Sequence, residues 1–80
     1  MDKWIEIKEI PNPGRKTKAF AVHTIYGEKV LLGAIKWFSR WRKYCFFPEY
    51  STVYEWKCLR DISDFIEEET KKYKKDWYKG

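Results

Sequence analysis

Four segments of the chain alternate apolar and polar positions with the two-residue period of a half-buried β-strand. In the first segment, Ile5 and Ile7 share one side, while Glu6 and Lys8 share the other. The third segment is the most apolar, and Gly33 in its middle indicates a bulge or a close backbone approach. The alternation predicts strands over residues 4–10, 19–26, 30–38 and 41–47.

Proline and glycine mark the ends of these segments. The run Pro11-Asn12-Pro13-Gly14 can continue neither a strand nor a helix, so the first strand is expected to end there. Gly27-Glu28 has the glycine-first order of a type II′ turn, which predicts a compact hairpin between the second and third strands. Ser39-Arg40 is expected to turn the chain into the fourth strand, which Pro48 ends.

The last part of the chain changes to the period of a helix. Lysines gather toward its C-terminal end, where the helix dipole favours cations. We expect a helix over about residues 56–73 and a frayed tail over residues 76–80. One apolar stripe along this helix contains Cys58, Leu59, Ile62, Phe65 and Ile66.

These elements predict an α+β fold in which a four-stranded antiparallel β-meander packs on one C-terminal α-helix (ββββα). At 80 residues the chain is expected to form a single domain, 1–80. One helix covers only one face of such a sheet. The other face is therefore expected to be open to solvent or to a partner, as antiparallel sheets tolerate.

The chain is unusually rich in rings, since 20% of its residues are aromatic, while 36% are charged. A core of this size does not need so many rings, so some are expected at the surface, where Trp and Tyr suit contact sites. The longest apolar run, residues 30–35, is only strand-length, and the first residues lack an apolar signal-peptide core. We therefore expect a cytoplasmic protein without a membrane partner.

The net charge of +5 is concentrated in the middle of the chain. Residues 11–50 carry eight Lys and Arg against two Glu, whereas residues 51–80 carry seven charges of each sign. A concentrated excess of one sign creates a directional field, which can attract a polyanion such as nucleic acid.

The sequence contains no recognisable catalytic or metal site, so we expect a non-enzymatic protein without a cofactor. His23 is the only histidine, and its neighbours on the same side of the strand are Ala and Ile, so it is expected to be a satisfied or half-buried side chain. Cys45 and Cys58 lack the spacing of a zinc site. They are expected to be reduced, small, buried hydrophobic residues, although one disulfide between them is arithmetically possible.

Residues 37–48 are the most distinctive segment, because three basic residues are interleaved with six aromatic ones. Arg and Lys can neutralise phosphates while Trp and Tyr stack on bases, and the same residue types form hot spots at protein interfaces. The alternative is core packing with solvated charges, since aromatic residues favour strands. A basic loop nearby could add phosphate contacts or be a solvated turn. The candidate binding residues are Lys36, Trp37, Arg40, Trp41, Arg42, Lys43 and Tyr44, with Arg15, Lys16 and Lys18 of the loop.

Four stretches between residues 30 and 66 follow a recurring layout. They are Leu32-Gly33-Ala34-Ile35-Lys36-Trp37, Trp41-Arg42-Lys43-Tyr44-Cys45-Phe46-Phe47-Pro48, Thr52-Val53-Tyr54 and Cys58-Leu59-Arg60-Asp61-Ile62. This layout resembles that of small proteins encoded by bacteriophages and prophages. No activity is established for that group, so the resemblance implies an origin in an infected bacterial cell and, by analogy, binding of nucleic acid or host proteins.

We therefore expect a small phage-type accessory protein that binds DNA or RNA through a basic and aromatic sheet surface. The alternative is a protein-interaction module that binds or inhibits a host protein, with Trp37, Trp41 and Tyr44 as anchors. A homodimer formed through an edge strand is a third arrangement that the sequence leaves open.

Overall fold

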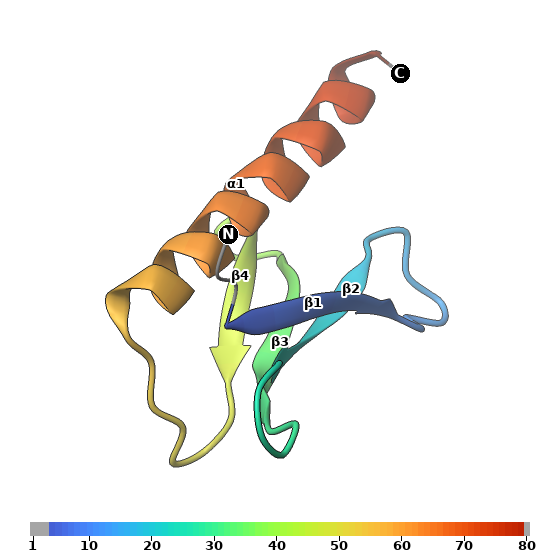
Figure 1. The fold of residues 1–80 in the computed structure, drawn as a ribbon. Helices are drawn as coiled ribbons and strands as arrows, with labels where there is room; N and C mark the ends of the chain where they lie inside the picture. The colour runs from blue at the N-terminus through green and yellow to red at the C-terminus, as the bar shows by residue number, and fades with distance from the viewer. Residues whose placement is uncertain (1–3, 80) are drawn as a thin grey trace.

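The computed structural model describes residues 4–79, with side chains as far as Lys74, and it confirms the predicted ββββα fold (Figure 1). The four strands form one antiparallel sheet in the order β1-β2-β3-β4, and one helix crosses one of its faces. The elements are β1 (Ile5–Ile10), β2 (Ala19–Thr24), β3 (Leu31–Phe38), β4 (Lys43–Pro48) and α1 (Trp56–Lys79).

The helix is longer than expected. It continues to Lys79 instead of ending near residue 73, because neither Pro nor Gly occurs between Trp56 and Lys79. Residues 76–79 are therefore helical, and the predicted frayed tail is wrong for them; Gly80 lies outside the described residues. The last turns of α1 extend beyond the sheet (Figure 1).

Two strand boundaries differ from the expected ones by two residues, and three others differ by one. β4 begins at Lys43 rather than at residue 41, because residues 39–42 form the turn that follows β3. β2 ends at Thr24, and residues 25–30 make a longer connection than the predicted two-residue hairpin. The hydroxyl of Thr24 closes this connection by accepting a hydrogen bond from the amide of Val30 at 2.9 Å.

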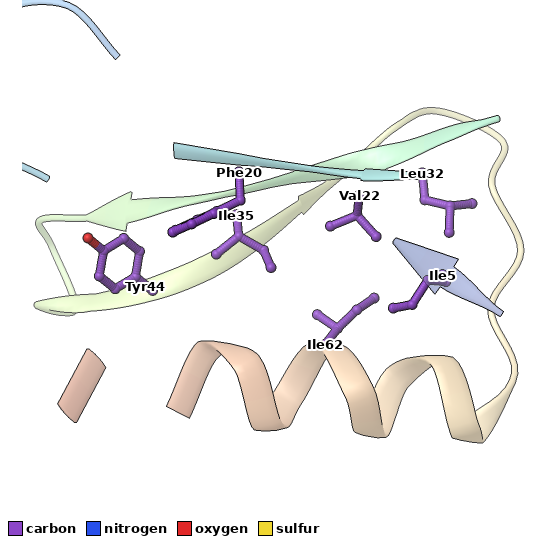
Figure 2. Close-up of a cluster of buried hydrophobic side chains, with 7 residues drawn as sticks. All are labelled: Ile5, Phe20, Val22, Leu32, Ile35, Tyr44 and Ile62. Atoms are coloured by element: carbon purple, nitrogen blue, oxygen red, sulfur yellow. The ribbon is translucent and has the colours of Figure 1, made fainter. Parts of the chain in front are cut away.

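The core lies between the sheet and α1 (Figure 2). Complete burial of an aliphatic or aromatic side chain stabilises the fold by about 1.5–3 kcal/mol, so this cluster holds the two layers together. From the predicted stripe, Ile62 is fully buried and Phe65 and Ile66 are partly buried, whereas Leu59 is 50% exposed. The cluster contains Ile5, Phe20, Val22, Leu32, Ile35, Tyr44 and Ile62.

The structure confirms both features predicted at Gly33, a bulge and a close backbone approach. The register of β2 and β3 shifts next to the Val22–Gly33 pair, so Leu32 is the extra residue of a bulge. A Cβ at Gly33 would also lie 2.5 Å from the carbonyl oxygen of Phe47 and 2.7 Å from the ring of Phe46. Only glycine allows β4 to approach β3 this closely.

Two basic segments leave the sheet at the same end, because Ala19 pairs with Lys36 and Lys36 pairs with Cys45. The first is the β1–β2 loop, and the second is the turn of residues 39–42. The loop is fixed internally by the Asn12 side chain, which donates to the Thr17 carbonyl at 2.9 Å. The Lys18 amide donates to the Tyr44 hydroxyl at 3.0 Å, which ties the loop to the core.

Candidate nucleic-acid interface

The sheet face that α1 leaves uncovered is built from alternate residues of the four strands. Phe20, Val22, Ile35 and Tyr44 belong to the core, so the residues next to them in each strand point away from α1. The antiparallel register arranges these residues in rows across the sheet. The open face, as we call it, is the part of this surface nearest the β1–β2 loop and the turn of residues 39–42, without the pair Glu6 and His23 farther along β1 and β2; it comprises Lys8, Ile10, Ala19, Ala21, Ala34, Lys36, Phe38, Lys43, Cys45 and Phe47.

The open face has a consistent chemistry. Its ten residues include three lysines and two phenylalanines but no carboxylate. Ala19 and Ala21 near its centre are themselves buried, at 2% and 8% exposed, so the longer side chains around them provide its accessible surface. The row beyond it contains Glu6, whose carboxylate pairs with the ammonium of Lys29 at 3.4 Å. A polyanion placed on the open face would therefore meet cations and apolar rings.

Three aromatic side chains continue from the turn onto the open face. The ring of Trp41 lies 5.1 Å from that of Phe38, edge to face, and the ring of Phe38 lies 6.1 Å from that of Phe47. The ammonium of Lys36 stands 4.9 Å from the centre of the Phe47 ring, in cation–π geometry. We call Trp41, Phe38 and Phe47 the aromatic row.

The turn of residues 39–42 presents its side chains to solvent. The amides of Trp41 and Arg42 both donate to the carbonyl of Phe38, at 3.1 and 2.9 Å. Arg42 closes the turn in the left-handed region, with φ of 54°. Trp41 is 65% exposed as a result, although strand alternation predicted that it belongs to β4.

A cleft of about 240 Å³ lies where the β1–β2 loop meets β3 and β4. Arg15 and Lys36 contribute cations to it, and Phe47 contributes the last ring of the aromatic row. Two cations beside polar groups suit an anionic ligand such as a phosphate. The remaining lining residues are Asn12, Thr17 and Trp37.

Most of the predicted binding residues lie on the surface. Eight of the ten are exposed, namely seven cations and one ring: Arg15, Lys16, Lys18, Lys36, Arg40, Trp41, Arg42 and Lys43. Trp37 is half-buried, because its ring packs against those of Tyr44 at 5.4 Å and Tyr73 at 4.6 Å.

Tyr44 requires a correction. It is only 3% exposed, since it belongs to the core cluster, and its amide donates to the Thr70 hydroxyl of α1 at 3.1 Å. Its ring therefore cannot stack on a ligand, and its hydroxyl serves the β1–β2 loop through Lys18 instead.

Two rings of the open face, Phe38 and Phe47, were not among the predicted binding residues, although the neighbouring Trp37 was. The signal was present in the alternation, because Phe38 has the same parity as Lys36, and Phe47 has the same parity as Lys43.

A larger cleft, of about 460 Å³, lies on the other side of the molecule, between β1 and α1. Its polar lining is mostly acidic, with Asp61, Asp64, Glu68 and Glu69 beside Lys72. Such a lining repels phosphate, so this cleft does not extend the candidate interface.

Cys45 and Cys58 carry free thiols, and each is half-buried rather than buried. Burial raises the pKa of both thiols, so neither is a reactive thiolate at neutral pH. Among the described residues, no group of three or more His, Cys, Asp or Glu side chains could hold a metal ion. Within residues 4–79, no helix has both the length and the apolar character needed to cross a lipid bilayer.

Comparison with known proteins gives no family for this chain. No family model matches it, and neither a curated protein nor a solved structure is significantly similar to it. The resemblance to bacteriophage proteins stays a prediction.

Proposed function

We propose that this protein binds nucleic acid through the open face and the turn of residues 39–42. The observation that carries the proposal is the chemistry of this surface, where cations and accessible rings stand together and none of the ten residues of the open face is a carboxylate. The turn adds Arg40 and Arg42 beside the exposed ring of Trp41. Cations that neutralise phosphates and rings that stack on bases are the two components that nucleic-acid interfaces combine.

The distribution of acidic residues supports the same surface. Asp61, Asp64, Glu67 and Glu68 lie on α1, which covers the opposite face of the sheet. The same helix carries Lys57, Arg60, Lys71 and Lys72, so its charges nearly balance. It therefore attracts a phosphate backbone less than the open face does, where lysines stand without a carboxylate.

A titration of labelled DNA and RNA at about 50 and 200 mM salt tests this proposal, because phosphate contacts weaken over that range. We expect binding in the micromolar range or tighter that falls steeply as salt rises. The double variant Arg42→Gln, Lys43→Gln should bind more weakly. Its slope of log affinity against log salt should be shallower by roughly 1.5, the change expected for two lost phosphate contacts.

The matched control is the double variant Lys57→Gln, Lys71→Gln, which removes the same charge from exposed positions on α1. If both double variants weaken binding equally, net charge alone drives the interaction and the proposed surface is wrong. If the unaltered protein does not bind at about 50 mM salt, the proposed function itself is wrong.

A second candidate function is protein binding, and a specific patch favours it. At the other end of β3, Trp4 and Tyr26 pack edge to face at 5.2 Å, and both line an apolar pocket of about 290 Å³ with Val53. Tyr26 is 59% exposed and Val53 is 88% exposed. Accessible aromatic residues around an apolar pocket are typical of protein interfaces. These residues replace Trp37 and Tyr44, which pack inward, as candidate anchors.

Tyr26→Asp tests this second candidate against Tyr50→Asp, which places the same charge at an exposed tyrosine outside the pocket. A protein partner of the patch should be lost with the first variant and retained with the second. Equal retention by both variants would exclude the patch.

A further inference from the structure

The exposed rings of the proposed interface indicate whether single-stranded or double-stranded nucleic acid fits it. The aromatic row is continuous from Trp41 through Phe38 to Phe47, with ring centres 5.1 and 6.1 Å apart. Trp41 is 65% exposed and Phe47 is 37% exposed, so both ends of the row are accessible to a planar ligand. Indole and phenyl rings offer stacking surface and few hydrogen bonds, so they recognise the faces of bases rather than their edges.

The faces of bases are accessible only in unpaired strands. In a duplex each base is already stacked on its neighbours, and proteins instead read base edges in the grooves. The major groove is about 12 Å wide and admits a helix or a two-stranded ribbon. This molecule measures 43 × 26 × 20 Å, and its only described helix packs on the sheet, with the acidic residues Asp61, Asp64 and Glu68 in the cleft beside β1. Neither feature suits insertion into a groove.

The cations stand where the backbone of a stacked strand can reach them. Arg42 belongs to the turn at one end of the aromatic row, next to Trp41. Arg15 and Lys36 line the cleft at the other end, next to Phe47. The hydrogen bond from Asn12 to Thr17 holds the loop that contains Arg15, so this end of the path is formed before a ligand arrives.

We infer that the ligand is single-stranded nucleic acid, with bases stacked on Trp41 and Phe47 and phosphates at Arg42 and at the Arg15–Lys36 cleft. This inference rests on the proposed function and narrows it to unpaired strands. The path runs from the turn, across the outer rings of β3 and β4, to the β1–β2 loop.

The test compares single strands and duplexes of one sequence, as both DNA and RNA, by fluorescence anisotropy at about 50 mM salt. Strands of about 12 nucleotides are long enough, since small domains that bind single strands cover about 4–16 nucleotides. We expect single strands to bind at least about tenfold more tightly than duplexes, since base stacking on rings contributes only to the former. Trp41→Ala should lower affinity for single strands about tenfold and leave duplex binding unchanged.

Trp56→Ala is the matched control, because Trp56 is 60% exposed but lies at the start of α1. Thermal unfolding of both variants checks that they remain folded, and Phe47→Leu provides a second test that retains an apolar side chain. Equal affinity for single strands and duplexes would overturn this inference but leave the proposal of nucleic-acid binding intact. Unchanged affinity for single strands in both Trp41→Ala and Phe47→Leu would have the same consequence. Absence of binding to every form overturns the proposed function as well.

Discussion

Neighbouring residues in the middle of the chain have opposite environments. Trp41 projects from the turn into solvent, whereas Tyr44, three positions later, is buried in the core. The change occurs at Arg42, whose positive φ ends the turn and begins β4. One backbone conformation therefore determines which rings are available for binding and which stabilise the fold.

Arg42→Gly should stabilise the protein while weakening nucleic-acid binding. A side chain in the left-handed region costs roughly 1–2 kcal/mol, and glycine avoids this cost but loses more chain entropy on folding. We expect a net gain of up to about 1 kcal/mol in the free energy of unfolding, measured by urea denaturation. Arg40→Gly removes the same charge at a turn position without positive φ, so it should not stabilise. Equal stability changes in the two variants would contradict this account.

Tyr44→Phe should destabilise the fold without a direct effect on binding. The hydroxyl of Tyr44 is the acceptor for the Lys18 amide, so its removal should cost about 1 kcal/mol of stability. Denaturation and oligonucleotide titration of the same sample separate the two effects. A selective loss of binding at unchanged stability would return Tyr44 to the interface.

The same tyrosine predicts a loss of stability at alkaline pH. Burial raises the pKa of Tyr44, against a smaller opposing contribution from its hydrogen bond with Lys18. The native state therefore holds this proton more tightly than the unfolded state. Its contribution to stability is complete below about pH 10 and decreases as pH rises through the higher native pKa. In Tyr44→Phe, unfolding measured at increasing pH should lack this decrease; an unchanged profile would assign it to other groups.

At the level of elements, β3 and β4 depend on the close contact at Gly33. Gly33→Ala would place a methyl group 2.5 Å from the Phe47 carbonyl oxygen, so β4 must move. We expect a loss of about 1–3 kcal/mol in the free energy of unfolding. The neighbouring change Ala34→Gly, on the open face, should cost only about 0.5–1 kcal/mol through chain entropy. A larger loss of stability in Ala34→Gly than in Gly33→Ala, measured by denaturation, would contradict the importance of this close contact.

The start of α1 depends on Glu55, whose carboxylate accepts a hydrogen bond from the Cys58 amide at 2.6 Å. Desolvation raises the pKa of this carboxyl, but the hydrogen bonds to Cys58 and Lys57 outweigh it, so the pKa of Glu55 is lowered. The stabilising contribution is present above about pH 4.3 and disappears as pH falls through the lower native pKa. Glu55→Gln should therefore flatten the acid side of the stability profile, whereas Glu68→Gln on the middle of α1 should leave it unchanged.

The alternation of apolar and polar residues was sufficient to predict the elements and their order, because strands and helices impose different periods on a buried face. It could not place the start of β4, since Arg42 lacks the Gly or Asn signal that usually marks positive φ. It also missed the longer connection after β2, because a side chain of Thr24 rather than a two-residue turn closes it. The helix end was wrong for a different reason, since lysines near residue 73 signal an end but do not impose one.

For the whole molecule, each side of the sheet carries one cysteine whose alkylation can report where a ligand binds. Cys45 lies on the open face and Cys58 lies on α1, and both thiols are free. A saturating single-stranded oligonucleotide should slow alkylation of Cys45 several-fold and leave Cys58 unchanged. Mass spectrometry of a time course measures both rates in the same molecule, and mildly alkaline pH is needed because burial raises both thiol pKa values.

Protection of Cys58 alone would place the ligand on the helix side and contradict the proposed interface. Equal protection of both thiols would indicate general stabilisation of the fold instead.

The position of the candidate site itself was only partly predictable, because the sequence identifies Lys36 and Trp41 as candidates but not the face that α1 covers. Tyr44 and Phe38 illustrate this, since only the packed helix decides which ring is buried.

The position of α1 after the sheet also has a consequence for biosynthesis. A ribosome extends the chain at about 5–20 residues per second, so Ile62 and Phe65 follow Pro48 after roughly 1–3 s. During that interval the nascent meander has no cover for Val22 and Ile35, both of which are completely buried in the finished protein. The newly made sheet is therefore most prone to aggregation just before its helix emerges, and slow translation of the segment between β4 and α1 should increase the demand for chaperones.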